Sequence, residues 1–170
     1  MQLGPIRHRY TAKERAQKQG IGHYVYPRFT KLVDLNPSEG KNPSDYYRLI
    51  MQSELRNMQV VSDTIDCVKR GRTPVIMTKY KEHAQKLYDM LQGSADHVFL
   101  LQGGKSLKER SAIREQMAAV RADESIILVA IGQYVGEGFN YPRLDTMLLA
   151  MPISLEGNVE QHAGRLNRDY

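Results

Sequence analysis

Residues 158–170, which read Asn-Val-Glu-Gln-His-Ala-Gly-Arg-Leu-Asn-Arg-Asp-Tyr, hold the side chains with the clearest potential for chemistry. Asn158 can cap a helix there, and Gln161 stands where a capping box places a glutamate or glutamine. On that helix Gln161, Arg165 and Arg168 share one face. Guanidinium groups offer a fork of donors that suits phosphate oxygens, so this face could bind a phosphate group. The alternative interpretation is a solvated, mildly basic helix.

A second segment with chemical potential is the glycine-rich run at 132–143. Its glycines, Gly132, Gly136 and Gly138, permit positive φ angles and a close approach of the backbone to a ligand. Asn140 adds a polar side chain just before the next expected strand. The length and glycine density of this run favour a functional loop over an ordinary crossover.

The run Gln-Gly-Gly-Lys-Ser at 102–106 contains the tail of a Walker A loop. A nucleotide-binding P-loop also needs an earlier glycine at a fixed spacing, and this sequence lacks it. We therefore exclude a nucleotide cradle here. The backbone amides of Gly103 and Gly104, together with Lys105, could instead hold a nucleic acid phosphate at a helix N-terminus.

Other kinds of site find little support. The five histidines show no zinc-binding spacing, and neither H-E-x-x-H nor G-x-S-x-G occurs. Cys67 is the only cysteine, which excludes an intrachain disulfide and a cysteine-based zinc site. We expect no metal site in this chain.

The elements that must position these segments begin after residue 44, where short apolar runs alternate with amphipathic helical patterns. This alternation predicts an α/β fold in which helices cover both faces of a parallel sheet. Strands are expected at 74–78, 97–101, 125–131 and 144–151. Apolar residues at helical spacing predict the buried faces of two helices: Leu55, Met58, Val61, Ile65 and Val68 in the first, and Ala84, Leu87, Tyr88 and Leu91 in the second. A capping box formed by Ser106 and Glu109 predicts the start of a third helix.

Parallel sheets of this kind bind ligands at the carboxyl ends of their strands. That rule places Thr78 and Lys79, at the end of the first strand, on the same edge as the loops after the second and third strands. A hydroxyl and an amine at this position suit a phosphate contact.

Residues 1–43 differ from the rest of the chain and predict a basic entry strand or arm rather than a separate domain. Residues 23–35 are rich in Tyr, Val and Phe, and the polar run 36–44 contains the breakers Pro37, Gly40 and Pro43. A basic cluster could contact a nucleic acid backbone, although a solvated charge run is the alternative. Its members are Arg7, Arg9, Lys13, Arg15 and Lys18.

Composition bounds these interpretations. A chain of 170 residues fits one domain with a sizeable core, and the net charge of +5 with pI near 9.3 favours an anionic partner. A basic protein without a polyanionic partner is the alternative. The sequence shows neither a secretory signal nor eighteen consecutive apolar residues, so we expect no membrane association. The lone cysteine fits a reducing compartment, and we expect the cytoplasm.

Taken in order, these segments resemble the second RecA-like domain of superfamily 2 helicases and translocases, from about residue 72 onward. The run at 161–168 is similar to motif VI, Q-x-x-G-R-x-x-R, and the Gly-Glu-Gly-Phe-Asn-Tyr-Pro run at 136–142 to motif V. Residues 75–79 resemble motif IV, and 100–110 the stretch between motifs IV and V. Residues 4–10 are similar to the segment leaving the first motor domain of DEAD/DEAH-type helicases related to restriction-enzyme motor subunits.

The resemblance implies roles for particular residues. Arg165 and Arg168 would be arginine fingers that stabilise charge on the γ-phosphate of ATP during phosphoryl transfer, and Gln161 would help to position them. Gly138 and Asn140 would take part in ATP binding. The nucleic acid track, contacted through phosphate and sugar, would be bordered by Thr78, Lys79, Gly103, Gly104, Lys105 and Gln133.

Two departures from the family pattern matter. Asn140 stands where the family usually has aspartate, which removes a charge from motif V. The sequence also contains neither a Walker A loop nor a D-E-x-H/D box. ATP and Mg²⁺ would therefore be held mainly by an N-terminal RecA-like domain outside this sequence, and we expect 44–170 to be a C-terminally truncated RecA-like domain.

The sequence supports two alternative functions. The first is the second motor domain of an ATP-dependent helicase or translocase that acts on nucleic acid, DNA rather than RNA, and that is inactive without its partner domain. The second is a stand-alone nucleic-acid-binding module with no part in ATP hydrolysis.

Overall fold

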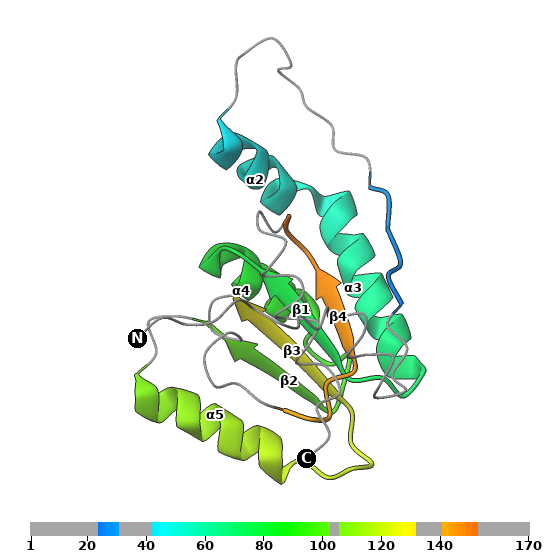
Figure 1. Cartoon of the computed structure of the whole chain (residues 1–170), viewed down its shortest axis with the longest axis vertical. Coiled ribbons are helices and arrows are strands. Elements are labelled where there is room, and N and C mark those ends of the chain that lie inside the picture. Colours follow the sequence, from blue (N-terminus) through cyan, green and yellow to red (C-terminus); the bar gives the residue numbers. More distant parts are fainter. Residues whose placement is uncertain (1–23, 31–41, 103–105, 132–140, 153–170) are drawn as a thin grey trace, which may run out of the picture.

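A computed structural model of the chain describes residues 24–30, 42–102, 106–131 and 141–152 (Figure 1). Its centre is a four-stranded sheet in the order β2-β3-β1-β4, and every pair of neighbouring strands is parallel. The strands are β1 (Pro74–Thr78), β2 (His97–Leu101), β3 (Ile126–Ile131) and β4 (Thr146–Leu149). The helices are α2 (Pro43–Gln52), α3 (Glu54–Lys69), α4 (Lys81–Met90) and α5 (Leu107–Ala119). The predicted α/β class and parallel sheet are confirmed.

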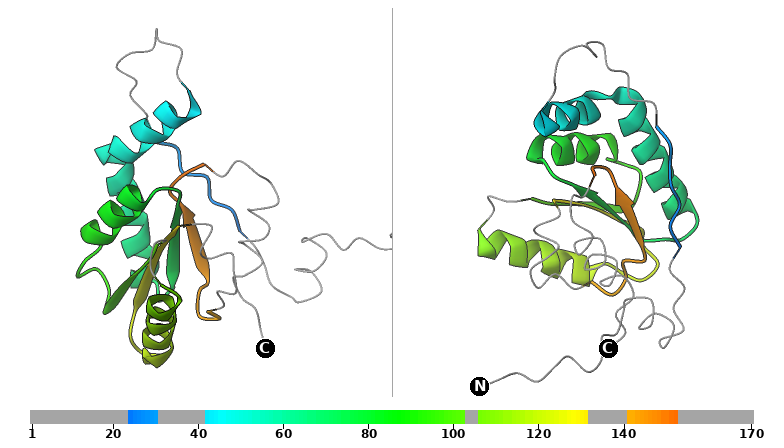
Figure 2. Two further views of the ribbon diagram at one scale, coloured as in Figure 1. Left: turned by 90° about the vertical axis from the view of Figure 1, so that its left-hand side faces the viewer. Right: turned by 45° about the horizontal axis from the view of Figure 1, so that its top comes forward.

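Helices cover both faces of this sheet. The right-hand view of Figure 2 shows α5 beneath the sheet and α4 above it, with α3 beside α4. Side chains alternate along β1, so that Val75 and Met77 join the core on the α5 side whereas Ile76 joins the core under α3 and α4. All residues of the central strands β1 and β3 are buried, which explains why their sequences are apolar without alternation.

Local sequence signals mark the ends of α3 and α4 and the start of α5. Gly71 and Gly93 follow α3 and α4 with φ angles of 73° and 78°, a conformation that costs glycine little. At the start of α5 the Glu109 N–H donates to Ser106 Oγ at 3.3 Å. The Ser106 N–H donates in return to Glu109 Oε2 at 2.7 Å, which completes the capping box.

The stretch expected as a polar hinge contains the start of a helix instead. Pro43 is the first residue of α2, a position where its missing N–H costs nothing. The Asn42 N–H donates to the Asp45 carboxylate at 3.1 Å and fixes the first turn. The boundary proposed between residues 43 and 44 thus falls within the first turn of α2.

The apolar face predicted for the next helix is correct in its second half and wrong in its first. Val61, Ile65 and Val68 pack against the core, but Leu55 and Met58 are 70% and 59% exposed. Two polar residues take the inward positions: Asn57 and Thr64 are fully buried. Both are tolerated because they are hydrogen-bonded, Thr64 Oγ1 to the Val60 carbonyl at 2.7 Å and Asn57 as described below.

The described part of the N-terminal arm, residues 24–30, runs alongside α3 without forming a helix or strand of its own (Figure 1). Arg28 donates two hydrogen bonds of 2.8 Å to the Asp63 carboxylate, a contact that also raises the pKa of the guanidinium. The Arg56 guanidinium donates to Thr30 Oγ1 at 2.7 Å and to the Ala150 carbonyl at 3.2 Å. These bonds fasten the segment to α3 and α3 to the end of β4. Among the helices that the structure describes, none combines the length and hydropathy needed to cross a bilayer.

Candidate nucleic-acid interface

Three of the segments singled out in the sequence leave the sheet at one edge. β1 and β3 run in register, with Thr78 opposite Ile131, and β2 pairs with β3 so that Leu101 lies opposite Ala130. Lys79 and the loops that follow Leu101 and Ile131 therefore begin side by side at the carboxyl edge. The other predicted site residues lie outside the described residues: Gly103, Gly104, Lys105, Gln133, Gly138, Asn140, Gln161, Arg165 and Arg168.

Lys79 is an exposed cation held above two aromatic rings. Its Nζ atom lies 4.3 Å from the ring centroid of Tyr47 and 5.8 Å from that of Tyr80. The two rings meet edge to face, with their centroids 6.0 Å apart. Contacts of this length are cation–π interactions, which hold the ammonium group in place without consuming its hydrogen-bond donors.

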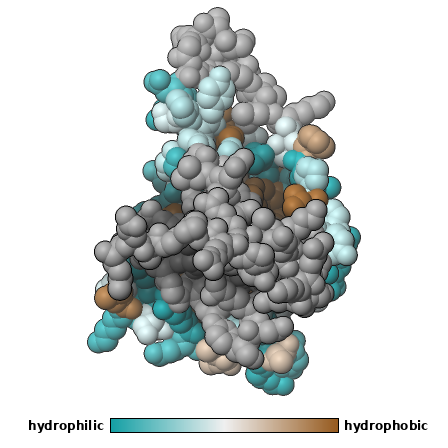
Figure 3. Space-filling model, viewed as in Figure 1, coloured by the Kyte–Doolittle hydropathy of each residue, from teal (hydrophilic) through white to brown (hydrophobic). Residues whose placement is uncertain are grey.

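Helix α2 supplies Tyr47, and the sequence analysis missed this residue because the helix itself was not expected to begin at Pro43. The signal that could have found it is the Asn-Pro-Ser-Asp start, in which a cap residue precedes proline and an acidic residue follows in the first turn. Figure 3 shows a mainly hydrophilic surface over the part of α2 that faces the viewer. The helix thus adds a polar surface beyond the carboxyl ends of the strands (Figure 1).

The Thr78 hydroxyl, in contrast, is buried and already hydrogen-bonded within the protein. The residue is 4% exposed, and its Oγ1 lies 2.7 Å from His83 Nδ1. His83 Nε2 lies 2.9 Å from Asn57 Oδ1, and Asn57 Nδ2 donates to the Met51 carbonyl at 2.9 Å. Because the amide oxygen of Asn57 can only accept, we assign the proton to Nε2, so that the Thr78 hydroxyl donates to Nδ1.

This buried chain of hydrogen bonds joins four elements. It runs from the end of β1 through α4 and α3 to the last turn of α2, and His83 at its centre is 2% exposed. Burial lowers the pKa of His83 to about 4, with smaller contributions from the charges of Arg56 and Lys86. The imidazole is therefore neutral at pH 7, and it serves as a link between elements rather than as a cation.

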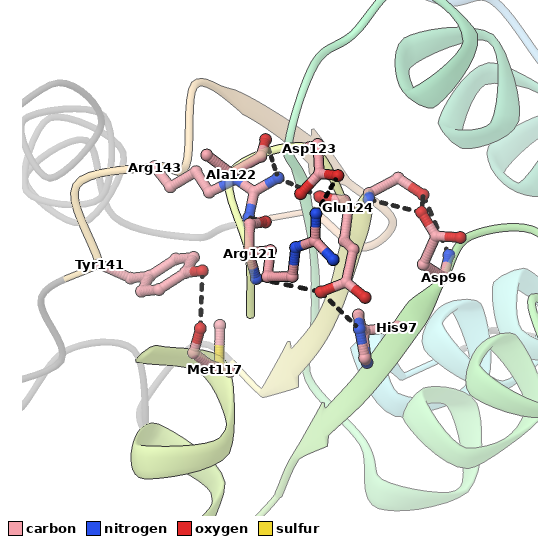
Figure 4. Close-up of polar contacts among 10 residues, drawn as sticks. Asp96, His97, Met117, Arg121, Ala122, Asp123, Glu124, Tyr141 and Arg143 are labelled. Carbon is pink, nitrogen blue, oxygen red and sulfur yellow. Dashed lines mark hydrogen bonds and ion pairs between the residues drawn. The ribbon is translucent and has the colours of Figure 1, made fainter. Parts of the chain in front are cut away.

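The opposite, amino edge of the sheet is closed by a separate polar cluster (Figure 4). The Arg143 guanidinium donates to the carbonyls of Arg121 and Ala122 at 2.9 and 3.2 Å, and also to the carbonyl of Glu124. The Tyr141 hydroxyl donates to the Met117 carbonyl at 3.0 Å. These bonds fasten residues 141–143 to the end of α5 and to the turn that follows it.

Other carboxylates near this edge also have local partners. Asp96 accepts from the Ser125 N–H and hydroxyl, which lowers its pKa, and Glu124 accepts from the Arg121 N–H, which lowers the pKa of that carboxyl (Figure 4). Asp145 accepts from the Thr73 N–H at 3.0 Å. The cluster thus stabilises turns at the edge remote from Lys79.

Two hollows lie along α4 on the described surface. One hollow of about 590 Å³ runs along α4 to the end of β2, and another of about 220 Å³ lies between α2 and α4. Both are lined by charged side chains of both signs, among them Arg48, Lys81, Glu82 and Lys86. Within the described ranges, no three histidine, cysteine or carboxylate side chains come together as a metal site would require.

We compared the chain with known protein families, curated proteins and solved structures. No family model matches the chain. The transcript termination protein A18 of fowlpox virus (strain NVSL) is 27% identical over 154 residues, a match that covers 85% of this chain and 32% of that protein. This chain therefore spans about a third of the length of its curated relative.

Two solved structures share the fold. The crystal structure of T4 UvsW superposes with a TM-score of 0.59 at 17% identity, over 76% of this chain and 26% of that one. The C-terminal part of the Fun30 ATPase domain superposes with a TM-score of 0.54 at 17% identity, over 74% of this chain and 41% of that one. This likeness shows that the chain shares the RecA-like α/β fold of these two structures.

Proposed function

We propose that this chain is the second motor domain of an ATP-dependent helicase or translocase that acts on nucleic acid. The observation that carries the proposal is that β1, β2 and β3 end side by side at the carboxyl edge of a RecA-like parallel sheet, directly before Lys79 and before the two sequence segments singled out above. The order of these segments along the sequence, ending in Q-x-x-G-R-x-x-R, supports the same function.

In this proposal ATP and Mg²⁺ bind mainly to a first RecA-like domain. The sequence contains neither a Walker A loop nor a D-E-x-H/D box, the motifs that would hold the phosphates and Mg²⁺. Arg165 and Arg168 would act as arginine fingers on the γ-phosphate, positioned by Gln161. Gly138 and Asn140 would contact the nucleotide from the 132–140 loop.

Nucleic acid would cross the carboxyl edge of the sheet. Lys79 is exposed there, and its ammonium group can donate to a phosphate oxygen. Gly103, Gly104, Lys105 and Gln133 would extend the track along the neighbouring loops. The Thr78 hydroxyl is bound to His83, so the contribution of Thr78 would be to hold Lys79 in place. Phosphate and sugar contacts of this kind do not depend on base sequence, and we propose DNA as the partner rather than RNA.

The test of this function is ATP hydrolysis with and without a single-stranded oligonucleotide. The chain alone should hydrolyse no ATP, because it lacks a phosphate cradle. Joined to a RecA-like domain that carries the Walker A and D-E motifs, it should hydrolyse ATP faster when nucleic acid is present.

The rival function is a nucleic-acid-binding module without an ATPase role, which the net charge of +5 favours. It predicts that the chain alone binds nucleic acid tightly and that this binding weakens with salt. It also predicts that nucleic acid does not change the rate of ATP hydrolysis by the joined two-domain protein. That combination would refute the motor-domain proposal.

A further inference from the structure

The cation and the two rings at the carboxyl edge form a site with two kinds of binding group. Lys79 offers a charge to a phosphate, and Tyr47 and Tyr80 offer aromatic surface within 6 Å of that charge. Building on the function proposed above, we infer that this cluster binds both the phosphate and the base of one nucleotide in a single strand. The phosphate would lie on Lys79, and the base would stack on the ring of Tyr47 or Tyr80.

The arrangement suits an unpaired nucleotide better than a duplex. In a duplex the bases are stacked on one another and only the backbone is within reach of an exposed lysine. In a single strand the base next to the bound phosphate is free to turn toward a ring, and stacking on an aromatic side chain tolerates any base. The cluster would therefore add preference for single strands to a track that otherwise reads only the backbone.

The surroundings favour nucleic acid over an apolar protein partner. Tyr46 is 49% exposed and Arg48 is exposed, both on the same helix as Tyr47. Figure 3 shows that the visible surface of this helix is hydrophilic. Aromatic rings interleaved with cations are the composition of a single-strand-binding surface, where charge tracks the backbone and rings meet the bases.

The cluster is also held ready for binding. Tyr47 lies one helical turn before Met51, whose carbonyl accepts from the buried Asn57 amide at 2.9 Å. Thr78, the neighbour of Lys79, is fastened through His83 to the same Asn57. One chain of buried hydrogen bonds thus fixes both the helix that carries Tyr47 and the strand end that carries Lys79, which reduces the ordering cost of binding.

A simpler role for Tyr47 would be to hold Lys79 in place, and a double-mutant cycle separates the two. Tyr47→Leu, Lys79→Gln and the double variant are titrated with a fluorescent twenty-nucleotide oligo-dT and with a duplex of equal length, over a series of salt concentrations. The cycle isolates the contribution of the ring, because Lys79→Gln leaves no ammonium group for Tyr47 to position.

Stacking predicts that Tyr47→Leu weakens oligo-dT binding about fivefold or more, in both the wild-type and the Lys79→Gln backgrounds. Duplex binding and the salt dependence should change little. Lys79→Gln should instead reduce the salt slope by about 0.7, the loss of one phosphate contact with a single strand. Tyr47→Phe keeps the ring and should keep the affinity, and Tyr24→Leu, at an exposed tyrosine beside α3, is the matched control.

A second readout guards against a folding defect in Tyr47→Leu. Photocrosslinking of an iodouracil-substituted strand to the unaltered protein should label Tyr47 or Tyr80. If the wild-type chain binds no oligonucleotide, the proposed function fails and the stacking site with it. If the chain binds and Tyr47→Leu weakens binding only while Lys79 is present, or neither tyrosine crosslinks, the stacking site alone is refuted.

Discussion

At the residue scale, His83 makes the stability of the folded chain depend on pH. Its pKa in the folded protein is about 4, below the ordinary value of 6.5, because burial disfavours the charged imidazole. The unfolded chain therefore binds more protons than the folded one between these values. Stability is fully present above about pH 6.5 and is lost as the pH falls toward 4.

This imbalance predicts that the free energy of unfolding falls by roughly 1–2 kcal/mol between pH 7 and pH 5. His83→Gln removes the titrating group and should flatten the profile over this interval. Urea unfolding at a series of pH values measures the effect, with the difference between wild type and variant isolating His83 from other groups. Parallel profiles for the two proteins would show that His83 is protonated as readily when folded as when unfolded.

At the element scale, local signals decided how well each helix and strand could be anticipated. The central strands were predictable because burial on both faces requires unbroken apolar runs, as in residues 126–131. The first half of α3 was not, because Asn57 can be buried there only with the help of His83 in α4, a hydrogen-bond partner 26 residues further along the chain. The same holds for positions at the carboxyl edge: the place of Lys79 there was predictable because it follows a strand, whereas the place of Tyr47 depends on how α2 packs.

Helix α5 offers a test of one local signal. Ser106→Ala removes the hydroxyl that accepts from the Glu109 N–H and should cost about 1 kcal/mol of stability. Ser111→Ala changes an exposed serine inside the same helix and should be neutral or slightly stabilising, since alanine is the better helix former. Thermal unfolding of the two variants compares them directly. Equal losses, or no loss in either, would mean that the cap does not stabilise α5.

At the scale of the whole molecule, the amino and carboxyl edges of the sheet carry different groups. At the amino edge, the Arg143 guanidinium is bonded to the carbonyls of the turn that follows α5. The carboxyl edge carries Lys79 and the loops that the sequence marks for nucleic acid and ATP. The motor-domain proposal therefore assigns nucleic acid and nucleotide contacts to the carboxyl edge alone.

The most direct measurement is nucleic-acid-stimulated ATP hydrolysis by the joined two-domain protein with Arg165→Ala or Arg168→Ala. Arginine fingers stabilise charge only in the transition state, so each variant should lose about 10³-fold in turnover while nucleic acid affinity stays nearly unchanged. Arg121→Ala, at an exposed arginine paired with Asp123 on the amino edge, should hydrolyse ATP as the wild type does. Undiminished turnover in both the Arg165 and Arg168 variants would contradict a motor-domain role that rests on these two residues.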